Sequence, residues 1–295
     1  MKKIFLSVCL LSIIPIEAGL CKVMTYNYPN SVIFIQELFG KSEEKRERRD
    51  ILKNLLNLYK PDILGTQETH LGDLCFFKEA LGSYEWVGER IPPLDTKDFF
   101  LSLGQSAGDY NGIFYNTKKF SKKADGTFWL NETMKKHEPS HWAADSRKYH
   151  HVRACTWAQL KDKETKEYVW VFNTHLSLDF EVRTQEVRLI GRFIEEKVPH
   201  GQKVIFLGDF NDFFGTTPWH ISVDEFKFFD SYTSAVEKVT NHVGSCCGAN
   251  RTATVDFIFL KNFADKAVTR YEIIDYKEKK GYASDHNPVM ITVNI

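Results

Sequence analysis

Short apolar runs recur along the chain, several end in polar side chains, and together they predict a strand-rich protein. Runs rich in Val, Ile, Phe, Tyr and Trp cover residues 20–27, 62–69, 110–116, 126–130, 151–160, 168–176, 203–212, 252–260 and 288–295. The polar segment KDKETKE lies between two of these runs and indicates a hairpin over residues 151–176. The remaining runs are separated by longer segments.

Three of the longer segments have the apolar spacing of helices. Residues 42–60 begin with Ser42 as a candidate N-cap and carry acids in the first turn and leucines at helical spacing. Residues 74–81 and 180–198 show the same period. Hairpins combined with strand–helix–strand units predict an α/β protein with two stacked mixed sheets flanked by helices. We expect one domain, residues 20–295, because no linker or repeat interrupts the pattern.

The N-terminus has the composition of a secretory signal peptide. Two lysines precede an apolar run from Ile4 to Ile14, and small residues follow at Ala18 and Gly19. We therefore predict a signal peptide over residues 1–19 and a secreted or periplasmic protein. An uncleaved segment that anchors the protein to a membrane, or a buried first helix or strand, are the alternatives.

The composition excludes a disordered chain, and the balance of charges excludes a strong electrostatic field around the whole protein. Of 295 residues, 43% are hydrophobic, which is ample for a packed core, and 39 Lys and Arg balance 39 Asp and Glu. Binding to nucleic acid or to an anionic membrane would therefore need a local patch. After signal cleavage Cys21, Cys75, Cys155, Cys246 and Cys247 remain, which permits one or two disulfides and requires none.

The candidate chemistry lies at the ends of the apolar runs. The polar residues there are Asn27, Glu68, His175, Asp209, Asn211, Asp256, Asp285 and His286. If strands of opposite direction alternate, the ends of some and the starts of others share one rim of the fold, where ligands commonly bind. Carboxylate oxygens suit a hard cation such as Mg²⁺, and histidines beside carboxylates suit phosphate binding or proton transfer. A tight turn at each position is the competing interpretation.

Eight motifs span nearly the whole mature chain, in the order MTYN, GTQET, YNGIFYN, VRACTWAQL, FNTHL, LGDFND, TVDFIFL and SDHNPV. Together they resemble the endonuclease/exonuclease/phosphatase superfamily, which includes pancreatic deoxyribonuclease and neutral sphingomyelinases. The resemblance implies a four-layer α/β sandwich. It also implies a metal-dependent hydrolase that cleaves phosphoester bonds by in-line attack of water.

When the roles known in the family are carried over motif by motif, the resemblance implies which residues bind the metal and which position the attacking water. Glu68 would be the principal ligand of Mg²⁺, with Mn²⁺ as a possible substitute, and Asn27 and Asp285 would assist it. Asp209 would activate or position the attacking water, and Asn211 would steady that water.

The same carry-over assigns the phosphate contacts. His286 would bind the scissile phosphate and Asp256 would keep its ring charged and oriented. His175 would face the phosphate as an acid or as an electrostatic stabiliser, and Arg153 would contact the phosphate directly.

Two segments at the expected substrate rim depart from the pattern of the bacterial metal-dependent hydrolases that the chain resembles. Relatives often carry Asp-His shortly after NTHL, where this chain has Ser177, Leu178 and Asp179, and the segment TNHVGSCCGAN over residues 240–250 is unusual. Phe213 and Phe214 are candidates for membrane insertion, base stacking or core packing. These departures leave the substrate open.

Three functions stay open from the sequence. The first is an exported Mg²⁺-dependent phosphodiesterase, possibly a nuclease, and the second is a sphingomyelinase-like phosphoesterase for lipids or small molecules. Inositol-polyphosphate phosphatases are disfavoured, because Phe213 and the VDF sequence replace their arginines. A catalytically silent binding module is third. We expect a monomer whose partner is its phosphoester substrate, with no obligate protein partner.

Overall fold

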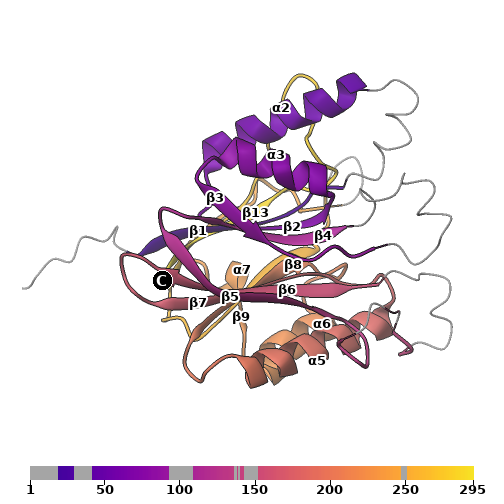
Figure 1. Cartoon of the computed structure of the whole chain (residues 1–295), viewed down its shortest axis with the longest axis vertical. Helices are drawn as coiled ribbons and strands as arrows, with labels where there is room; N and C mark the ends of the chain where they lie inside the picture. Colours follow the sequence, from indigo (N-terminus) through magenta and orange to yellow (C-terminus); the bar gives the residue numbers. More distant parts are fainter. Residues whose placement is uncertain are drawn as a thin grey trace, which may run out of the picture.

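Two β-sheets stacked face to face, with helices on both outer faces, make up the computed structural model (Figure 1). The structure describes residues 19–29, 42–92, 109–135, 138, 140–142, 152–246 and 251–295. The first sheet has the order β10-β12-β13-β1-β2-β4-β3 and the second the order β5-β6-β7-β8-β11-β9. This arrangement confirms the α/β four-layer sandwich predicted from the sequence.

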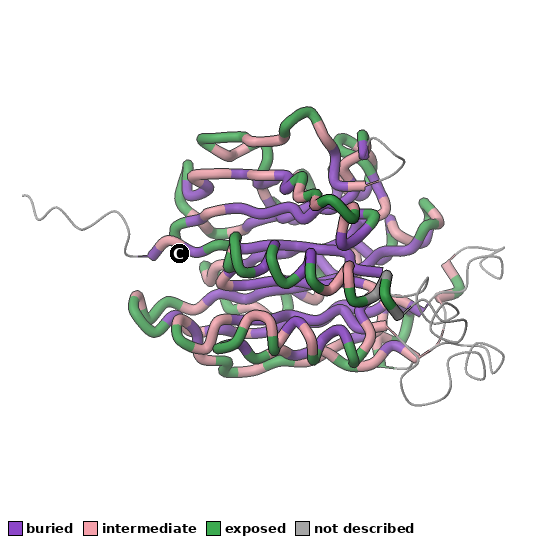
Figure 2. The backbone as a smooth tube through the Cα atoms, turned by 90° about the horizontal axis from the view of Figure 1, so that it is seen from above, coloured by how far each residue is buried: buried purple, intermediate pink, exposed green. Residues whose placement is uncertain are grey.

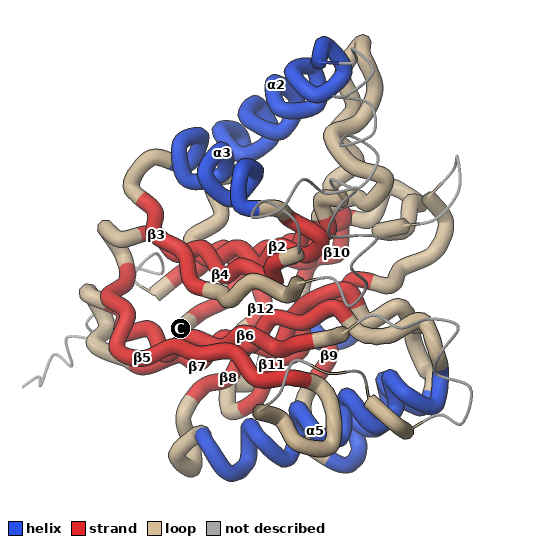
Figure 3. The backbone as a smooth tube through the Cα atoms, turned by 45° about the vertical axis from the view of Figure 1, so that its right-hand side comes forward, coloured by secondary structure: helices blue, strands red, loops and turns tan. Residues whose placement is uncertain are grey.

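The first sheet combines β1 (Leu20–Asn27), β2 (Ile63–Thr69), β3 (Tyr84–Val87), β4 (Tyr110–Asn116), β10 (Glu237–Val239), β12 (Val268–Ile273) and β13 (Val289–Asn294). Helices α2 (Ser42–Tyr59) and α3 (Leu71–Leu81) cover its outer face, as Figure 3 shows. The apolar stripe of α2 packs on Met24 and Leu64 of the sheet, because the helical spacing of its leucines places them on one buried face.

The second sheet combines β5 (Phe120–Trp129), β6 (Ala154–Asp162), β7 (Tyr168–His175), β8 (Lys203–Asp209), β9 (Phe229–Asp230) and β11 (Asp256–Lys261). Its outer face is covered by α5 (Phe180–Lys197), α6 (Thr217–His220) and the π-helical turn η2 (Ile221–Glu225). The short helix α7 (Ser231–Ser234) follows β9. Asp179 caps α5, because its side chain accepts the backbone N–H groups of Glu181 and Val182.

The main core lies between the two sheets. Side chains such as Val23, Ile113, Val171, Leu207 and Ile291 interdigitate there and are fully shielded from solvent. The buried tube segments of Figure 2 accordingly run along the strands in the middle of the molecule. Burial on both faces explains why these strands read as continuous apolar runs and not as strict alternation.

The strand directions bring the predicted polar residues to one rim. Parallel pairing of β7 with β8 sets His175 opposite Asp209, and antiparallel pairing of β8 with β11 sets Asp209 opposite Asp256. In the other sheet, parallel β1 and β2 end together at Asn27 and Gln67. Since β13 runs antiparallel to β1, its start lies at the same rim. The expectation of a shared rim is therefore met.

The apolar runs predicted the central strands better than the edges. Strand β5 begins at Phe120 and not at Gly126, and helix α3 begins at Leu71 and not at Leu74. The elements β3, β9, β10, β12, α6, η2 and α7 were missed. Lys122 and Lys123 of β5, and Arg270 and Glu272 of β12, interrupt the apolar signal. Charged residues are typical of strands near sheet edges, where one face or edge meets water.

Some predictions concern residues outside this description. Residues 1–18 of the predicted signal peptide and Cys247 lie outside the described residues. Cys21, Cys75, Cys155 and Cys246 are free thiols. No described helix combines the length and apolar character needed to cross a membrane.

Gly208 provides a test of how tightly β7 and β8 are packed at the rim. Its φ of +147° is a glycine conformation, and a Cβ at this position would lie 2.0 Å from the carbonyl oxygen of Thr174. We expect Gly208→Ala to lower the free energy of unfolding by about 3 kcal/mol or more, measured by urea denaturation. Gly72→Ala is the control, since α3 leaves room for a methyl group there, and its effect should stay below about 1 kcal/mol. Equal effects of the two substitutions would contradict the packing argument.

Candidate active site

Glu68 occupies a strained position near the end of β2. The pairing of β2 with β4 shifts register between Thr66 and Thr69, and Glu68 within this bulge has a φ of +55°. A bulge of this kind redirects a side chain, and a left-handed backbone at a residue other than glycine is characteristic of functional sites. Burial raises the pKa of Glu68, while hydrogen bonding to Asn27 and the charge of Arg153 act against that rise.

The side-chain amide of Asn27 connects the two sheets. Its Nδ2 donates to Glu68 Oε1 at 3.0 Å and to Asp209 Oδ2 at 2.8 Å. One amide thus holds two carboxylates from different sheets, and it is itself 1% exposed. The amide oxygen Oδ1 is buried and has no hydrogen-bond partner among the described residues.

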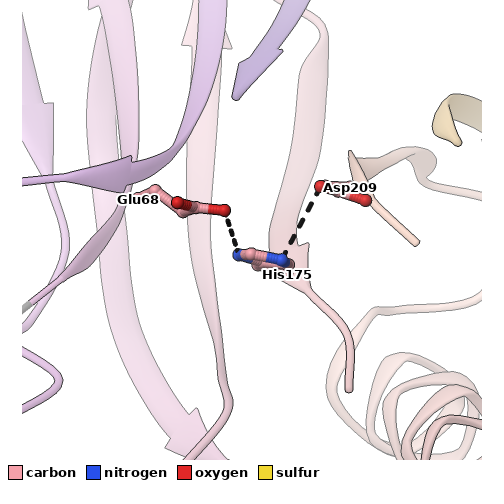
Figure 4. Close-up of side chains that lie close together, drawn as sticks. All are labelled: Glu68, His175 and Asp209. Carbon is pink, nitrogen blue, oxygen red and sulfur yellow. Dashed lines mark ion pairs between the residues drawn. The ribbon is translucent and has the colours of Figure 1, made fainter. Parts of the chain in front are cut away.

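His175 stands between the same two carboxylates, as Figure 4 shows. Its Nδ1 lies 3.8 Å from Glu68 Oε1, and its Nε2 lies 3.6 Å from Asp209 Oδ2. Asn211 Nδ2 is 2.9 Å from His175 Nε2 and also donates to the carbonyl of Leu176. If the amide donates to the ring, Nε2 is the acceptor and the ring proton resides on Nδ1.

Asp209 lies at the centre of the site. It is 1% exposed, and burial together with the charge of Asp256 raises its pKa to about 7, against the lowering effect of His286. The backbone N–H of Asn211 donates to Asp209 Oδ1 at 2.8 Å, and Asn211 has a left-handed φ of +48°. The turn after β8 therefore orients Asp209 and, through the Asn211 amide, His175.

Asp256 and His286 form a buried ion pair on the other side of Asp209. His286 Nδ1 is 2.9 Å from Asp256 Oδ2, and its Nε2 lies 3.8 Å from Asp209 Oδ2. Burial disfavours a charged imidazole, but the charge of Asp256 and its hydrogen bond outweigh burial and raise the pKa of His286 to about 12. His286 is accordingly a fixed cation at neutral pH.

Two predicted residues lie at the margin of this cluster. Asp285 is exposed, its Oδ1 lies 3.3 Å from Ser284 Oγ, and it is outside the groups of close ligand atoms that contain Glu68 and Asp209. Arg153 is half-buried, and its charge lowers the pKa of both Glu68 and Glu186, so the guanidinium lies near both carboxyls. The roles of all these residues remain predictions.

One of the two segments that depart from relatives, residues 240–250, reaches the site. Ser245 Oγ accepts the backbone N–H groups of Val255 and Asp256, and Cys246 contributes to the raised pKa of His286. Phe213 and Phe214 are 54% and 56% exposed, so the core-packing interpretation of this pair was wrong.

Sequence reasoning missed a buried carboxylate that contacts the chain just after His175. Glu186 of α5 is 1% exposed, and it accepts the backbone N–H of Ser177 at 2.8 Å and the Ser177 hydroxyl at 2.7 Å. It thereby holds the chain two residues after His175. A polar residue at a core position of the α5 pattern was the available signal, but its partner could not be read from spacing.

The donor set fits a divalent cation of the hard type. Ligand atoms of Glu68, His175 and Asp209 lie within 4.8 Å of one another, and the unpartnered Oδ1 of Asn27 lies in the same amide that bridges the carboxylates. Oxygen donors of this kind suit Mg²⁺ or Mn²⁺. A second close group, Asp209 with Asp256 and His286, is better described as a hydrogen-bonded ion pair, because a charged imidazole does not bind metal.

The fold and this rim of carboxylates, imidazoles and a guanidinium define a hydrolase that acts on phosphoester bonds. Residues 24–286 match the sequence model of the Endonuclease/Exonuclease/phosphatase family. The chain belongs to this family of metal-dependent phosphoester hydrolases, which confirms the resemblance seen in the motifs.

Known proteins similar to this chain cover nearly all of it. A mannosyl-6-phosphatase from Bacteroides thetaiotaomicron is 25% identical with a TM-score of 0.75, and 92% of this chain matches 99% of that one. A family protein from Bacteroides vulgatus is 26% identical with a TM-score of 0.75, over 94% and 99% of the two chains. An uncharacterised protein of Acanthamoeba polyphaga mimivirus is 24% identical over 83% of this chain and 90% of its own length.

Glu186 should make stability depend on pH. Burial raises its pKa to about 7 from an ordinary value near 4.5, against opposing hydrogen bonds from Ser177. The folded protein therefore binds an extra proton between those pH values, and the contribution of Glu186 to stability is lost as pH rises through this window. Relative to wild type, Glu186→Gln should gain up to about 3 kcal/mol of unfolding free energy between pH 4.5 and 8, measured by urea denaturation at each pH. A pH-independent difference would show that Glu186 is already ionised at pH 4.5.

Proposed function

We propose that this protein is an exported Mg²⁺-dependent phosphodiesterase that hydrolyses its substrate by in-line attack of water. The observation that carries the proposal is the continuous network from Asp256 through His286, Asp209 and His175 to Glu68. The network combines the protonated ring of His286, the carboxylate of Asp209 with its pKa near neutral, and several oxygen donors close together.

Glu68 and the amide oxygen of Asn27 would hold the cation. Bound Mg²⁺ would supply a positive charge that neutralises the phosphoryl oxygens and orients them. The acidic character of the cluster supports this assignment, since Asp209 and Asp256 are both 1% exposed and repel each other. Asp285 is a less central candidate than predicted, because its side chain is exposed.

Asp209 is the best candidate for the general base. A pKa of about 7 lets the carboxylate accept the proton of a water molecule at neutral pH. As the water oxygen bonds to phosphorus, the bond from phosphorus to the leaving alcohol breaks. The Nδ1–H of His175 is the available donor for the departing oxygen.

His286 and Arg153 would bind the phosphoryl group. His286 stays protonated because of Asp256, and Arg153 is a guanidinium near Glu68, so both can stabilise the added negative charge of the transition state. Asn211 would act by fixing Asp209 and His175 in place, rather than by holding the water itself.

A small-molecule phosphoester is the second candidate substrate. The similarity to a mannosyl-6-phosphatase favours it, at 25% identity over 92% of this chain. The preference for a diester rests on charge, because a rim with one nearby guanidinium and several carboxylates suits a singly charged phosphodiester better than a dianionic monoester.

The test is hydrolysis by the purified protein of plasmid DNA, RNA, sphingomyelin, bis(p-nitrophenyl) phosphate and mannose 6-phosphate, with Mg²⁺, Mn²⁺ or a chelator. We expect metal-dependent diester cleavage and a loss of about 10²- to 10⁴-fold in kcat for Asp209→Asn. Asp224→Asn, an exposed carboxylate paired with His220, is the matched control and should retain wild-type rates. Cleavage of the monoester alone would favour the second candidate, and full activity of Asp209→Asn would exclude Asp209 as the base.

Export rests on the N-terminal pattern of two lysines, an apolar run and small residues. Mass spectrometry of protein recovered from outside the cytoplasm of an exporting bacterial host should find a chain that begins near Leu20. Recovery of an intact N-terminus from the membrane fraction would instead indicate an uncleaved anchor.

A further inference from the structure

A cavity of 280 Å³ lies beside the active site, at the edge shared by the two sheets. Aromatic side chains form much of its wall, with Phe214 from the turn after β8, Phe257 from β11 and Tyr271 from β12. Tyr232 of α7 and Val243 of the unusual 240–250 segment complete the mouth. None of the residues that line the cavity has a role in the catalytic proposal.

The cavity exists because strand β9 is only two residues long. It pairs with Phe259 and Leu260 of β11 and ends at Asp230, whose side chain caps α7 by accepting the backbone N–H of Tyr232. Among the described strands, the edge of β11 from Asp256 to Ile258 therefore has no partner on this side. The chain turns away there and leaves an opening between the sheets.

The cavity adjoins the site along β11, because Phe257 and Ile258 of its lining directly follow Asp256, whose carboxylate pairs with His286. Phe214 lies three residues after Asn211, and Thr254, which also lines the cavity, lies two residues before Asp256. Burial, followed by the charges of Asp230 and Asp256, raises the pKa of Tyr271, so this wall is within electrostatic reach of Asp256. A phosphate bound by His286 would therefore lie near the β11 wall of the cavity.

The walls select an uncharged, flat group. Asp230 is the carboxylate in the lining, and both of its oxygens are already bonded, one to Trp219 Nε1 at 2.7 Å and one to the backbone N–H of Tyr232 at 2.7 Å. Ring faces and edges such as those of Tyr232 and Tyr271, 5.3 Å apart and T-shaped, favour a further aromatic ring. An apolar cavity of about 150 Å³ holds benzene in another protein, so this volume admits one ring system.

We propose that this cavity is a substrate subsite that binds a planar, uncharged ring carried by the alcohol part of the phosphoester. The inference rests on the proposed function, which it deepens by naming the substrate class as ring-bearing esters. An aryl group and a nucleobase share this chemistry.

The test compares substrates with a constant p-nitrophenol leaving group and a changing second ester group. In kcat/KM, phenyl p-nitrophenyl phosphate should exceed methyl p-nitrophenyl phosphate by at least about tenfold, the effect of about 1.4 kcal/mol. The p-nitrophenyl ester of thymidine 5′-monophosphate separates the two sources, since a further preference for it indicates a base and equality with phenyl indicates any aryl ring.

Substitutions in the cavity wall test whether the cavity causes the preference for the phenyl ester. Phe214→Ala and Tyr232→Ala should reduce the phenyl-to-methyl ratio to about one while leaving methyl ester turnover unchanged, and both side chains are exposed enough, at 56% and 41%, to be removed without unfolding. Tyr232→Phe keeps the ring and should keep the ratio. Leu58→Ala, an exposed apolar residue on α2 of the other sheet, is the matched control. A wild-type ratio near one, or a ratio unaffected by both alanine variants, would overturn the subsite.

A binding measurement separates this inference from the proposed function. With Mg²⁺ present, phenylphosphonate should bind at least about tenfold more tightly than methylphosphonate by titration calorimetry, and Tyr232→Ala should remove the difference. Discrimination in binding without turnover of any diester would contradict the proposed function and support the subsite. Turnover of a diester with no preference for the phenyl compound in either assay would support the proposed function and contradict the subsite.

Discussion

The active site depends on one side-chain amide that spans the two sheets. Asn27 ends a strand of the first sheet and donates hydrogen bonds to Glu68 beside it and to Asp209 in the second sheet. Two carboxylates that would repel each other in a buried setting are held through a shared neutral donor. A second cross-sheet link lies just behind, where Gln67 Nε2 donates to Asn173 Oδ1 at 2.6 Å. Together these contacts fix the distance between the part of the rim on the first sheet and the part on the second sheet.

The rim concentrates groups that cost stability. Asp209, Asp256 and Glu186 are each about 1% exposed, and a buried carboxylate is unfavourable unless it is paired and hydrogen-bonded. The structure compensates differently for each one. Asp256 is paired with a charged imidazole, and Glu186 receives two hydrogen bonds from Ser177. Asp209 accepts hydrogen bonds from Asn27 and Asn211, and its pKa nevertheless stays raised to about 7. Costs of this kind are expected at a site built for function.

The edge of the second sheet decides what lies next to that centre. Strand β9 stops after Asp230, so the first part of β11 is left without a partner on that side and an aromatic-walled cavity forms there. The segment that supplies Thr240 and Val243 to the cavity wall also places Ser245 against the backbone of Asp256. Variation in a loop of this kind changes the substrate rim and leaves the strands that carry the catalytic groups intact.

The sequence by itself determined the central strands, the helices α2 and α5, and the residue types at the rim. Apolar runs and helical spacing carry that information locally, and polar residues that follow buried strands mark a rim wherever strand ends meet. Strands near a sheet edge, such as β12 beside the edge strand β10, were missed because charged residues interrupt their apolar pattern. Only the tertiary structure decided which polar groups touch. Asn27 and Asp209 are 182 residues apart, and their contact follows from strand register and sheet stacking. The partner of Glu186, the exposure of Asp285 and the cavity beside β11 depend on that same long-range packing, which no local pattern specifies.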